Sequence, residues 1–144
     1  MTQDLIAKYK LRLEAHRVPM ANGSHELLTF GEGRITCHAV FIEVTYQSQI
    51  LPDGSEIATV NGILRAKKSC DFAIFQGIRS WRCEPCKKPP LQLWRGAVAV
   101  QSQSPKFVEL NARSFWTETK IVPEGPVIER WWALDEELEV EEDE

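Results

Sequence analysis

The feature of this sequence that most constrains its fold is a succession of short runs rich in Val, Ile, Thr and aromatic residues, each bounded by Gly, Pro, Asp or Ser. Such runs are typical of β-strands, because branched and aromatic side chains pack well on a pleated surface and the bounding residues favour turns. Strands are expected near residues 26–30, 34–49, 56–67, 70–78, 91–101, 107–119 and 127–132. LPDGSE at 51–56 predicts a hairpin turn, since Asp53-Gly54 accepts a positive φ.

The N-terminal segment carries a different pattern, with Leu5, Ile6, Tyr9 and Leu13 at helical spacing before Pro19. We expect a helix at 3–16 followed by five to seven antiparallel strands. This combination predicts a mainly β fold, either a small antiparallel barrel (OB-like) or a sandwich. A single globular domain would span residues 1–132, with its β part from about 26 to 132, and a disordered acidic tail would span 133–144.

Charge is distributed unevenly along the 144 residues. The chain has a net charge of −4, yet the last twelve residues hold eight acidic residues and no basic one. Residues 61–120 hold eleven Lys and Arg against four Asp and Glu. A basic body with an acidic tail favours a polyanionic partner, and the tail itself is suited to competing with that partner, to docking a basic protein or to keeping the domain soluble.

Basic residues in the central segment stand beside aromatic rings, as in RSWRCEPCKK at 79–88 and ARSFW at 112–116. Proteins that bind single-stranded nucleic acid need both groups, because cations follow the phosphates and rings stack on the bases. The alternative for each ring is a place in the core, and for each cation a solvated surface position. The predicted nucleic-acid-binding residues are Arg65, Lys67, Lys68, Arg79, Trp81, Arg82, Lys87, Lys88, Arg95, Arg113 and Phe115.

A long first strand, a hairpin and further strands around a variable connection resemble the OB-fold proteins that bind single-stranded nucleic acid. The resemblance covers roughly residues 26–120 and concerns strand spacing. It implies a barrel whose partner is single-stranded DNA or RNA.

Two cysteines, Cys83 and Cys86, have the C-x-x-C spacing of a zinc knuckle, and Cys70 precedes them. This order is similar to the zinc subdomain of T4-type phage single-strand-binding proteins, which also have acidic C-terminal tails. The sequence leaves open a structural zinc ion on Cys70, Cys83 and Cys86 or thiols without a metal, and no other cofactor is expected. A redox pair is disfavoured, because Pro89 and Pro90 prevent the helix that such a motif requires.

The sequence contains no phosphate-binding loop, no H-E-x-x-H motif and no G-x-S-x-G motif, so a non-enzymatic protein is expected. No apolar run approaches a membrane span and the N-terminus is charged, which predicts a cytoplasmic protein without a membrane partner. The alternative function is a protein-binding adaptor or inhibitor, phage or plasmid encoded, acting through the acidic C-terminus and Trp131-Trp132. Homodimerisation through exposed edge strands stays open.

Overall fold

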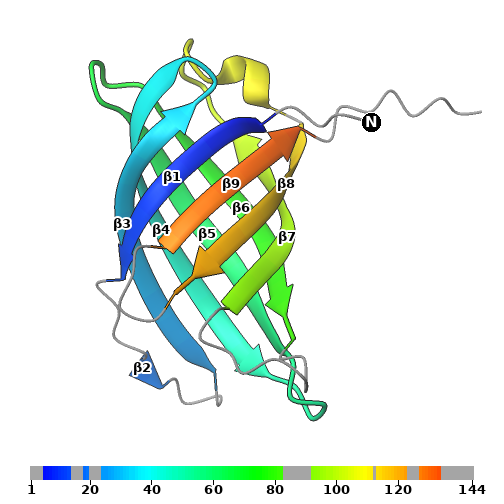
Figure 1. Cartoon of the computed structure of the whole chain (residues 1–144). Helices are drawn as coiled ribbons and strands as arrows, with labels where there is room; N and C mark the ends of the chain where they lie inside the picture. The colour runs from blue at the N-terminus through cyan, green and yellow to red at the C-terminus, as the bar shows by residue number, and fades with distance from the viewer. Residues whose placement is uncertain are drawn as a thin grey trace, which may run out of the picture.

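Eight antiparallel strands close into a barrel in the computed structural model, which describes residues 5–13, 18–19, 24–82, 92–111, 113–122 and 127–133 (Figure 1). The barrel strands are β1 (Leu5–Leu13), β3 (His25–Ile35), β4 (His38–Ile50), β5 (Glu56–Ala66), β6 (Phe72–Trp81), β7 (Gln92–Gln101), β8 (Ser114–Ile121) and β9 (Val127–Ala133). The two-residue β2 (Val18–Pro19) pairs with the start of β3. A short 3₁₀ helix, η1 (Val108–Leu110), lies between β7 and β8.

Strands β3 to β9 form a meander in which each strand pairs with the next along the chain. The N-terminal strand β1 closes the barrel, because it pairs with β9 on one side and with β3 on the other. Tyr9, for example, is opposite Glu129 on β9 and Gly33 on β3. Closure leaves none of the eight strands with a free edge over these paired residues.

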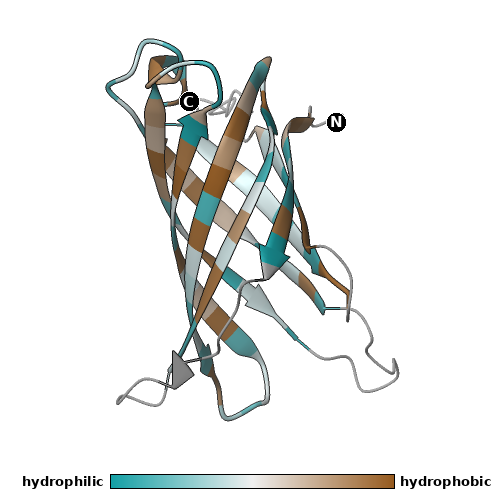
Figure 2. Cartoon of the chain, turned by 90° about the vertical axis from the view of Figure 1, so that its left-hand side faces the viewer, coloured by the Kyte–Doolittle hydropathy of each residue, from teal (hydrophilic) through white to brown (hydrophobic). Residues whose placement is uncertain are grey.

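The core fills the inside of the barrel with alternate residues of each strand. On β4, Val40, Ile42, Val44 and Tyr46 are buried, while the residues between them are exposed or half-buried. Figure 2 shows the resulting alternation of hydrophobic and hydrophilic positions along the strands. This period of two is the pattern that a barrel wall requires, since successive side chains point to opposite faces.

A glycine makes room for one of the large rings in the core. Gly62 lies opposite Phe75, and a Cβ at Gly62 would come within 2.0 Å of the Phe75 ring. The Phe75 ring packs edge-on against Trp131, with 4.9 Å between the ring centroids. Trp131 also stacks on Phe115 and meets the edge of Tyr9, so these rings fill the middle of the barrel.

The predicted N-terminal helix is wrong, and the barrel has eight strands where five to seven were expected. Residues 5–13 form β1, in which Ala7, Tyr9 and Leu11 are buried and the Lys and Arg residues between them are exposed. This strict alternation is visible in the sequence and is a stronger signal than the helical spacing of four apolar residues. With β1 in its wall, the barrel also differs from the OB-like arrangement that strand spacing indicated.

Two further boundaries differ from prediction. The strand expected at 34–49 is broken by a two-residue turn at Thr36 and Cys37, where Thr36 has a φ of 51°. A β-branched residue seldom adopts this conformation, so the sequence gives no turn signal there. The run at 107–119 contains η1 before β8 begins. The turn predicted at Asp53-Gly54 is confirmed, and Gly54 has a φ of 85°.

Within the described residues, the structure has no helix of the length and apolar character needed to cross a membrane.

Candidate functional site

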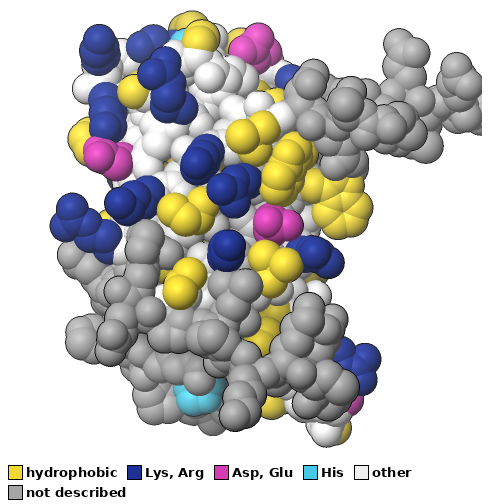
Figure 3. Space-filling view, viewed as in Figure 1, with side chains coloured by type: hydrophobic (Ala, Val, Ile, Leu, Met, Phe, Trp, Pro, Cys, Tyr) yellow, Lys and Arg dark blue, Asp and Glu magenta, His cyan; other side chains and the backbone are white. Residues whose placement is uncertain are grey.

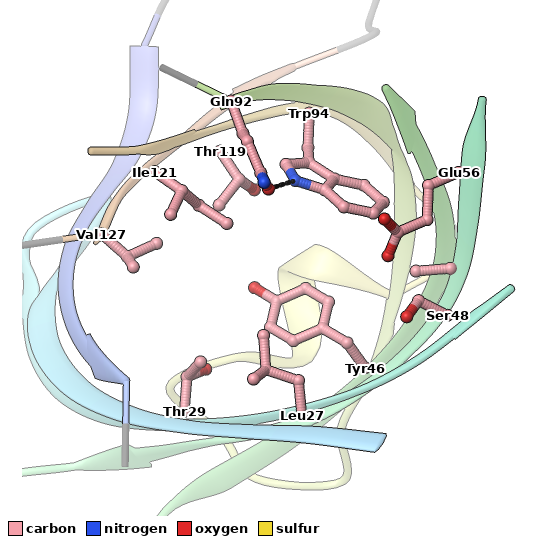
Figure 4. Close-up of a pocket in the computed structure, with 11 residues that line it drawn as sticks. Leu27, Thr29, Tyr46, Ser48, Glu56, Gln92, Trp94, Thr119, Ile121 and Val127 are labelled. Carbon is pink, nitrogen blue, oxygen red and sulfur yellow. Dashed lines mark hydrogen bonds between the residues drawn. The ribbon is translucent and has the colours of Figure 1, made fainter. Parts of the chain in front are cut away.

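A cavity of about 410 Å³ lies at the end of the barrel that carries the β4–β5 turn (Figure 4). It is lined by Leu27, Thr29, Tyr46, Ser48, Glu56, Ala58, Gln92, Trp94, Thr119, Ile121 and Val127. The opposite end is filled by Phe107 and Leu110, which are buried, and Phe107 meets His38 edge-on at 5.7 Å between ring centroids. The cavity volume falls in the range of roughly 300 to 1,000 Å³ that is typical of small-molecule sites.

The cavity lining combines polar and apolar side chains. Figure 4 shows the carboxylate of Glu56 and the hydroxyl of Ser48 on one side, and Ile121 and Val127 on the other together with Thr29 and Thr119. Adjacent antiparallel strands supply Ser48 and Glu56, because the β4–β5 turn brings the end of β4 beside the start of β5. Such a lining matches a ligand that has both polar groups and an apolar body.

Two indole rings lie near Glu56, and that of Trp94 lines the cavity. Trp94 donates a hydrogen bond from Nε1 to Oε1 of Gln92 at 3.1 Å. Trp81 donates from Nε1 to Oε1 of Glu56 at 3.4 Å, and its ring centroid lies 6.0 Å from that of Trp94. These bonds hold the indoles and the Glu56 carboxylate in fixed orientations.

Two hydroxyl groups of the lining, from Tyr46 and Thr119, connect the cavity to a buried ion pair. Arg79 on β6 and Glu129 on β9 form this ion pair, and neither side chain is exposed. Nη1 of Arg79 lies 2.9 Å from the Tyr46 hydroxyl and 2.7 Å from the Thr119 hydroxyl, and donates to both. Both hydroxyls donate in turn to Oε1 of Glu129, and Nε1 of Trp131 donates to its Oε2 at 2.8 Å.

This network keeps Tyr46 protonated. Burial raises the pKa of Tyr46, the negative charge of Glu129 raises it further, and Arg79 only partly offsets these effects. Burial alone would lower the pKa of Arg79, but Glu129 and Tyr46 raise it overall, so the guanidinium stays charged. Tyr46 therefore presents a neutral hydroxyl at the inner wall of the cavity and is no base at neutral pH.

Two of the predicted nucleic-acid-binding residues lie inside the barrel. Arg79 belongs to the buried ion pair, and Phe115 stacks on Trp131 in the core. Neither side chain has exposed surface, so the predicted roles of Arg79 in phosphate binding and of Phe115 in base stacking are incompatible with this fold. Trp81 is half-buried and donates a hydrogen bond to Glu56, and Lys87 and Lys88 lie outside the described residues.

The remaining predicted cations do not converge on one strip of surface. Lys67 and Lys68 occupy the β5–β6 turn, next to Arg65 at the end of β5, whereas Arg82 follows the far end of β6. Arg95 projects from β7 and lies 3.9 Å from Glu118. The guanidinium of Arg113 sits over the Phe115 ring, 5.4 Å from its centroid. Lys67 pairs with Glu32 at 2.5 Å, and this hydrogen bond lowers the pKa of Glu32.

A different set of cations gathers on the outside of β3, β1, β9 and β8, and we call it the basic face. Cross-strand pairing places Lys8 directly opposite Arg34 on one side and Arg130 on the other. The basic face comprises Lys8, Lys10, Arg12, Arg34, Lys120 and Arg130. Figure 3 shows this side of the molecule, where Lys and Arg outnumber acidic side chains and stand among hydrophobic ones. Trp116 on β8 is 44% exposed.

Of the three cysteines predicted as metal ligands, the structure describes Cys70, which is exposed just before β6. Cys83 and Cys86 lie outside the described residues, so a zinc ion on the three cysteines stays a prediction. In the part of the chain that is described, no three His, Cys, Asp or Glu side chains cluster as metal ligands would.

The fold is shared with solved proteins of distant sequence. No protein-family model and no curated protein matches this sequence. A conserved protein of unknown function from Rhodopseudomonas palustris is similar with a TM-score of 0.70 and 12% identity, over 93% of this chain and 100% of that one. A protein of unknown function from Clostridium acetobutylicum has a TM-score of 0.68 and 12% identity, over 92% of this chain and 96% of that one. A β-barrel-like protein from Acinetobacter baumannii has a TM-score of 0.69 and 14% identity, over 92% of this chain and 94% of that one. These similarities establish the barrel fold alone.

Proposed function

We propose that this protein binds a small amphipathic organic molecule in the cavity at the open end of its barrel. The observation that carries the proposal is the cavity itself, because apolar side chains and a few polar groups converge there on about 410 Å³ of space. An eight-stranded barrel is just wide enough to hold one small ligand. No metal and no catalytic step form part of the proposal.

Titration of the protein with medium-chain alcohols such as octanol tests this proposal. Trp94 lines the cavity, so a bound alkyl chain should change its fluorescence in a saturable way. Val127→Phe fills part of the cavity and should weaken binding at least tenfold, the factor for about 1.4 kcal/mol. Ile128→Phe is the matched control, because the neighbouring residue points to the other face of β9. Absence of saturable binding, or equal losses in the two variants, would contradict the proposal.

A second candidate function, binding of single-stranded nucleic acid, is favoured by the basic face. Cross-strand pairing places the like charges of Arg34, Lys8 and Arg130 side by side. A bound polyanion would reduce the repulsion between them. Phe30, which is opposite Arg12, and Trp116 on β8 are exposed rings that would stack on bases. The residues of this candidate differ from those predicted from the sequence, although the partner is the same. Docking of a basic protein on the acidic tail stays a prediction, because residues 134–144 lie outside those described.

The nucleic-acid proposal is tested by fluorescence anisotropy with a labelled oligonucleotide at rising salt. Binding should weaken steeply as salt increases, because each phosphate contact releases counterions. No binding at low salt would remove this candidate without affecting the cavity proposal.

A further inference from the structure

We propose that the ligand of the cavity is an alcohol, whose hydroxyl group donates a hydrogen bond to the side-chain oxygens of Tyr46 and Thr119 at the inner end. This inference rests on the proposed function and names the chemical class of the ligand.

The hydroxyl hydrogens of Tyr46 and Thr119 are already used inside the protein. Tyr46 donates to Oε1 of Glu129 at 3.2 Å, and Thr119 donates to the same oxygen at 3.1 Å. Arg79 donates from Nη1 to both hydroxyl oxygens, at 2.9 Å and 2.7 Å. These directions follow from the partners, because a guanidinium only donates and an ionised carboxylate only accepts. Burial and the charge of Glu129 raise the pKa of Tyr46, so its hydrogen stays on the phenol oxygen.

The two hydroxyl oxygens keep room for one more hydrogen bond each. A hydroxyl oxygen has two lone pairs, and the bond from Arg79 uses one of them. Both residues line the cavity, and Figure 4 shows the Tyr46 hydroxyl directed into it, with Thr119 on the wall across from it. The inner end therefore offers acceptors, and the ligand has to supply the hydrogen.

The other polar side chains of the lining place free donors only toward the open end. Thr29 donates its hydroxyl hydrogen to a backbone carbonyl oxygen of β4 at 3.2 Å, and Trp94 donates to Oε1 of Gln92 at 3.1 Å. Gln92 keeps its own amide hydrogens, but it is the first residue of β7 and lies at the open end. Ser48 lies at the same end and donates to a backbone carbonyl oxygen of β3 at 3.5 Å.

Arg79 does not change this balance of donors and acceptors. Its Nε and Nη2 have no hydrogen-bond partner among the described residues, but the side chain is fully buried and is not part of the cavity lining. A carbonyl or ether oxygen at the inner end would meet other oxygens and would lose the hydrogen bonds that it makes with water. Because Arg79 and Glu129 carry opposite charges, this end gives a ligand ion no net attraction. A neutral hydroxyl group fits it best.

The apolar part of the lining accommodates the rest of such a ligand. Ile121 and Val127 are opposite each other at the end of β8 and the start of β9, nearer the open end than Thr119. Leu27 lies beside Tyr46 on the neighbouring strand. Burial of an alkyl or aryl body against these side chains supplies the apolar part of the affinity. The alcohol would thus enter with its hydroxyl group first.

The ligands 1-octanol, 2-octanone and 1-methoxyheptane provide the test. They contain the same numbers of carbon and oxygen atoms, and the alcohol alone has a hydrogen to donate. Each is titrated into the full-length protein and followed by tryptophan fluorescence and by the shift in melting temperature. We expect 1-octanol to bind about tenfold more tightly than the ketone or the ether, as one additional hydrogen bond would give.

Thr119→Val removes one of the two acceptors at nearly constant shape and should reduce this preference to about threefold or less. Thr117→Val is the matched control, because Thr117 is a buried residue of the same strand that does not line the cavity. This control should keep the tenfold preference. Tyr46→Phe removes the other acceptor and should act like Thr119→Val. If either variant fails to fold, the three ligands with the native protein still decide the question.

The outcomes separate this inference from the proposed function. Equal binding of the three compounds overturns the inference about the hydroxyl group and leaves the ligand cavity standing. Tighter binding of the ketone overturns it as well, and would indicate that the ligand reaches a donor such as Arg79. Failure of all three compounds to bind overturns the cavity proposal together with the inference. Equal loss of the preference in Thr117→Val and Thr119→Val would overturn the role of the lining hydroxyls.

Discussion

Arg79 and Glu129, which are 50 positions apart in the sequence, form an ion pair inside the barrel, with both side chains fully buried. Nε and Nη2 of Arg79 have no hydrogen-bond partner among the described residues. Burying an incompletely satisfied ion pair is expensive, since desolvation of two charges opposes their attraction. The pair therefore contributes more to the relative position of β6 and β9 than to the free energy of unfolding.

Removing one member of this pair should be much more harmful than removing both. Arg79→Met leaves the Glu129 carboxylate buried without its cation and should lower the free energy of unfolding by about 3 to 5 kcal/mol. The double variant Arg79→Met with Glu129→Leu should lose less than the single variant, because no buried charge remains. Urea unfolding of the variants measures these values. A double variant whose loss equals the sum for the two single variants would refute this account.

The two tyrosines should make the protein lose stability at alkaline pH. Burial raises the pKa of Tyr9 and Tyr46 above the ordinary value of 10.0, and the charge of Glu129 adds to this effect. Above about pH 10 the unfolded chain releases these protons while the folded protein keeps them. The stabilisation is therefore complete below pH 10, and the free energy of unfolding falls by about 1.4 kcal/mol per pH unit for each tyrosine above it.

Urea unfolding at a series of alkaline pH values measures this slope, and phenolate absorbance reports the ionisation directly. Tyr46→Phe should reduce the slope by about half, since Tyr9 remains. Phenolate absorbance that rises near pH 10 while the protein is still folded would contradict the raised pKa values of the two tyrosines.

Gly62 should tolerate no side chain while Phe75 is present. A Cβ at Gly62 would lie 2.0 Å from the Phe75 ring, so Gly62→Ala must displace the ring from its contact with Trp131. We expect a loss of about 1 to 3 kcal/mol, the usual cost of overpacking a core. Asn61→Ala, at the exposed neighbouring position, should stay within about 0.5 kcal/mol of the native protein. In a Phe75→Leu background the cost of Gly62→Ala should shrink, and an unchanged cost would contradict the packing argument.

Charge reversal in the basic face should affect stability and oligonucleotide binding in opposite directions. Lys8 stands opposite Arg34 and Arg130, so Lys8→Glu replaces two repulsions with two attractions and should stabilise the fold by about 0.5 kcal/mol. The same change should weaken oligonucleotide binding and reduce the slope of its salt dependence by about 1 or more. Lys68→Glu in the β5–β6 turn is the control and should leave binding close to the native value. If Lys68→Glu weakened oligonucleotide binding more than Lys8→Glu did, the result would favour the binding residues predicted from the sequence.

Local patterns in the sequence predicted much of this fold. The alternating strands from β5 to β9 and the turn at Gly54 follow from side-chain period and turn chemistry. Residues 5–13 carry two competing patterns, four apolar positions at helical spacing and the alternation of Ala7, Tyr9 and Leu11 with cations, and the structure follows the alternation. The turn at Thr36 has no sequence signal, because a β-branched residue seldom adopts a positive φ.

The candidate site could not be predicted in the same way, because it depends on contacts between distant strands. Glu56, Trp94 and Val127 meet only through the closed barrel, and none belongs to a recognisable motif. Arg79 resembles the other cations of its segment in sequence, yet its position on the inner side of β6 buries it. The row of Arg34, Lys8 and Arg130 likewise depends on the register that joins the first and last strands.

Because β1 is paired with β9, the wall of the barrel can close only after residues 127–133 have been synthesised. A nascent chain that has not yet delivered residues 127–133 leaves one edge of β1 and one edge of β8 without a partner. Unpaired edges of this kind recruit strands from other chains, so we expect the chain to be most prone to aggregation before residues 127–133 have paired with β1.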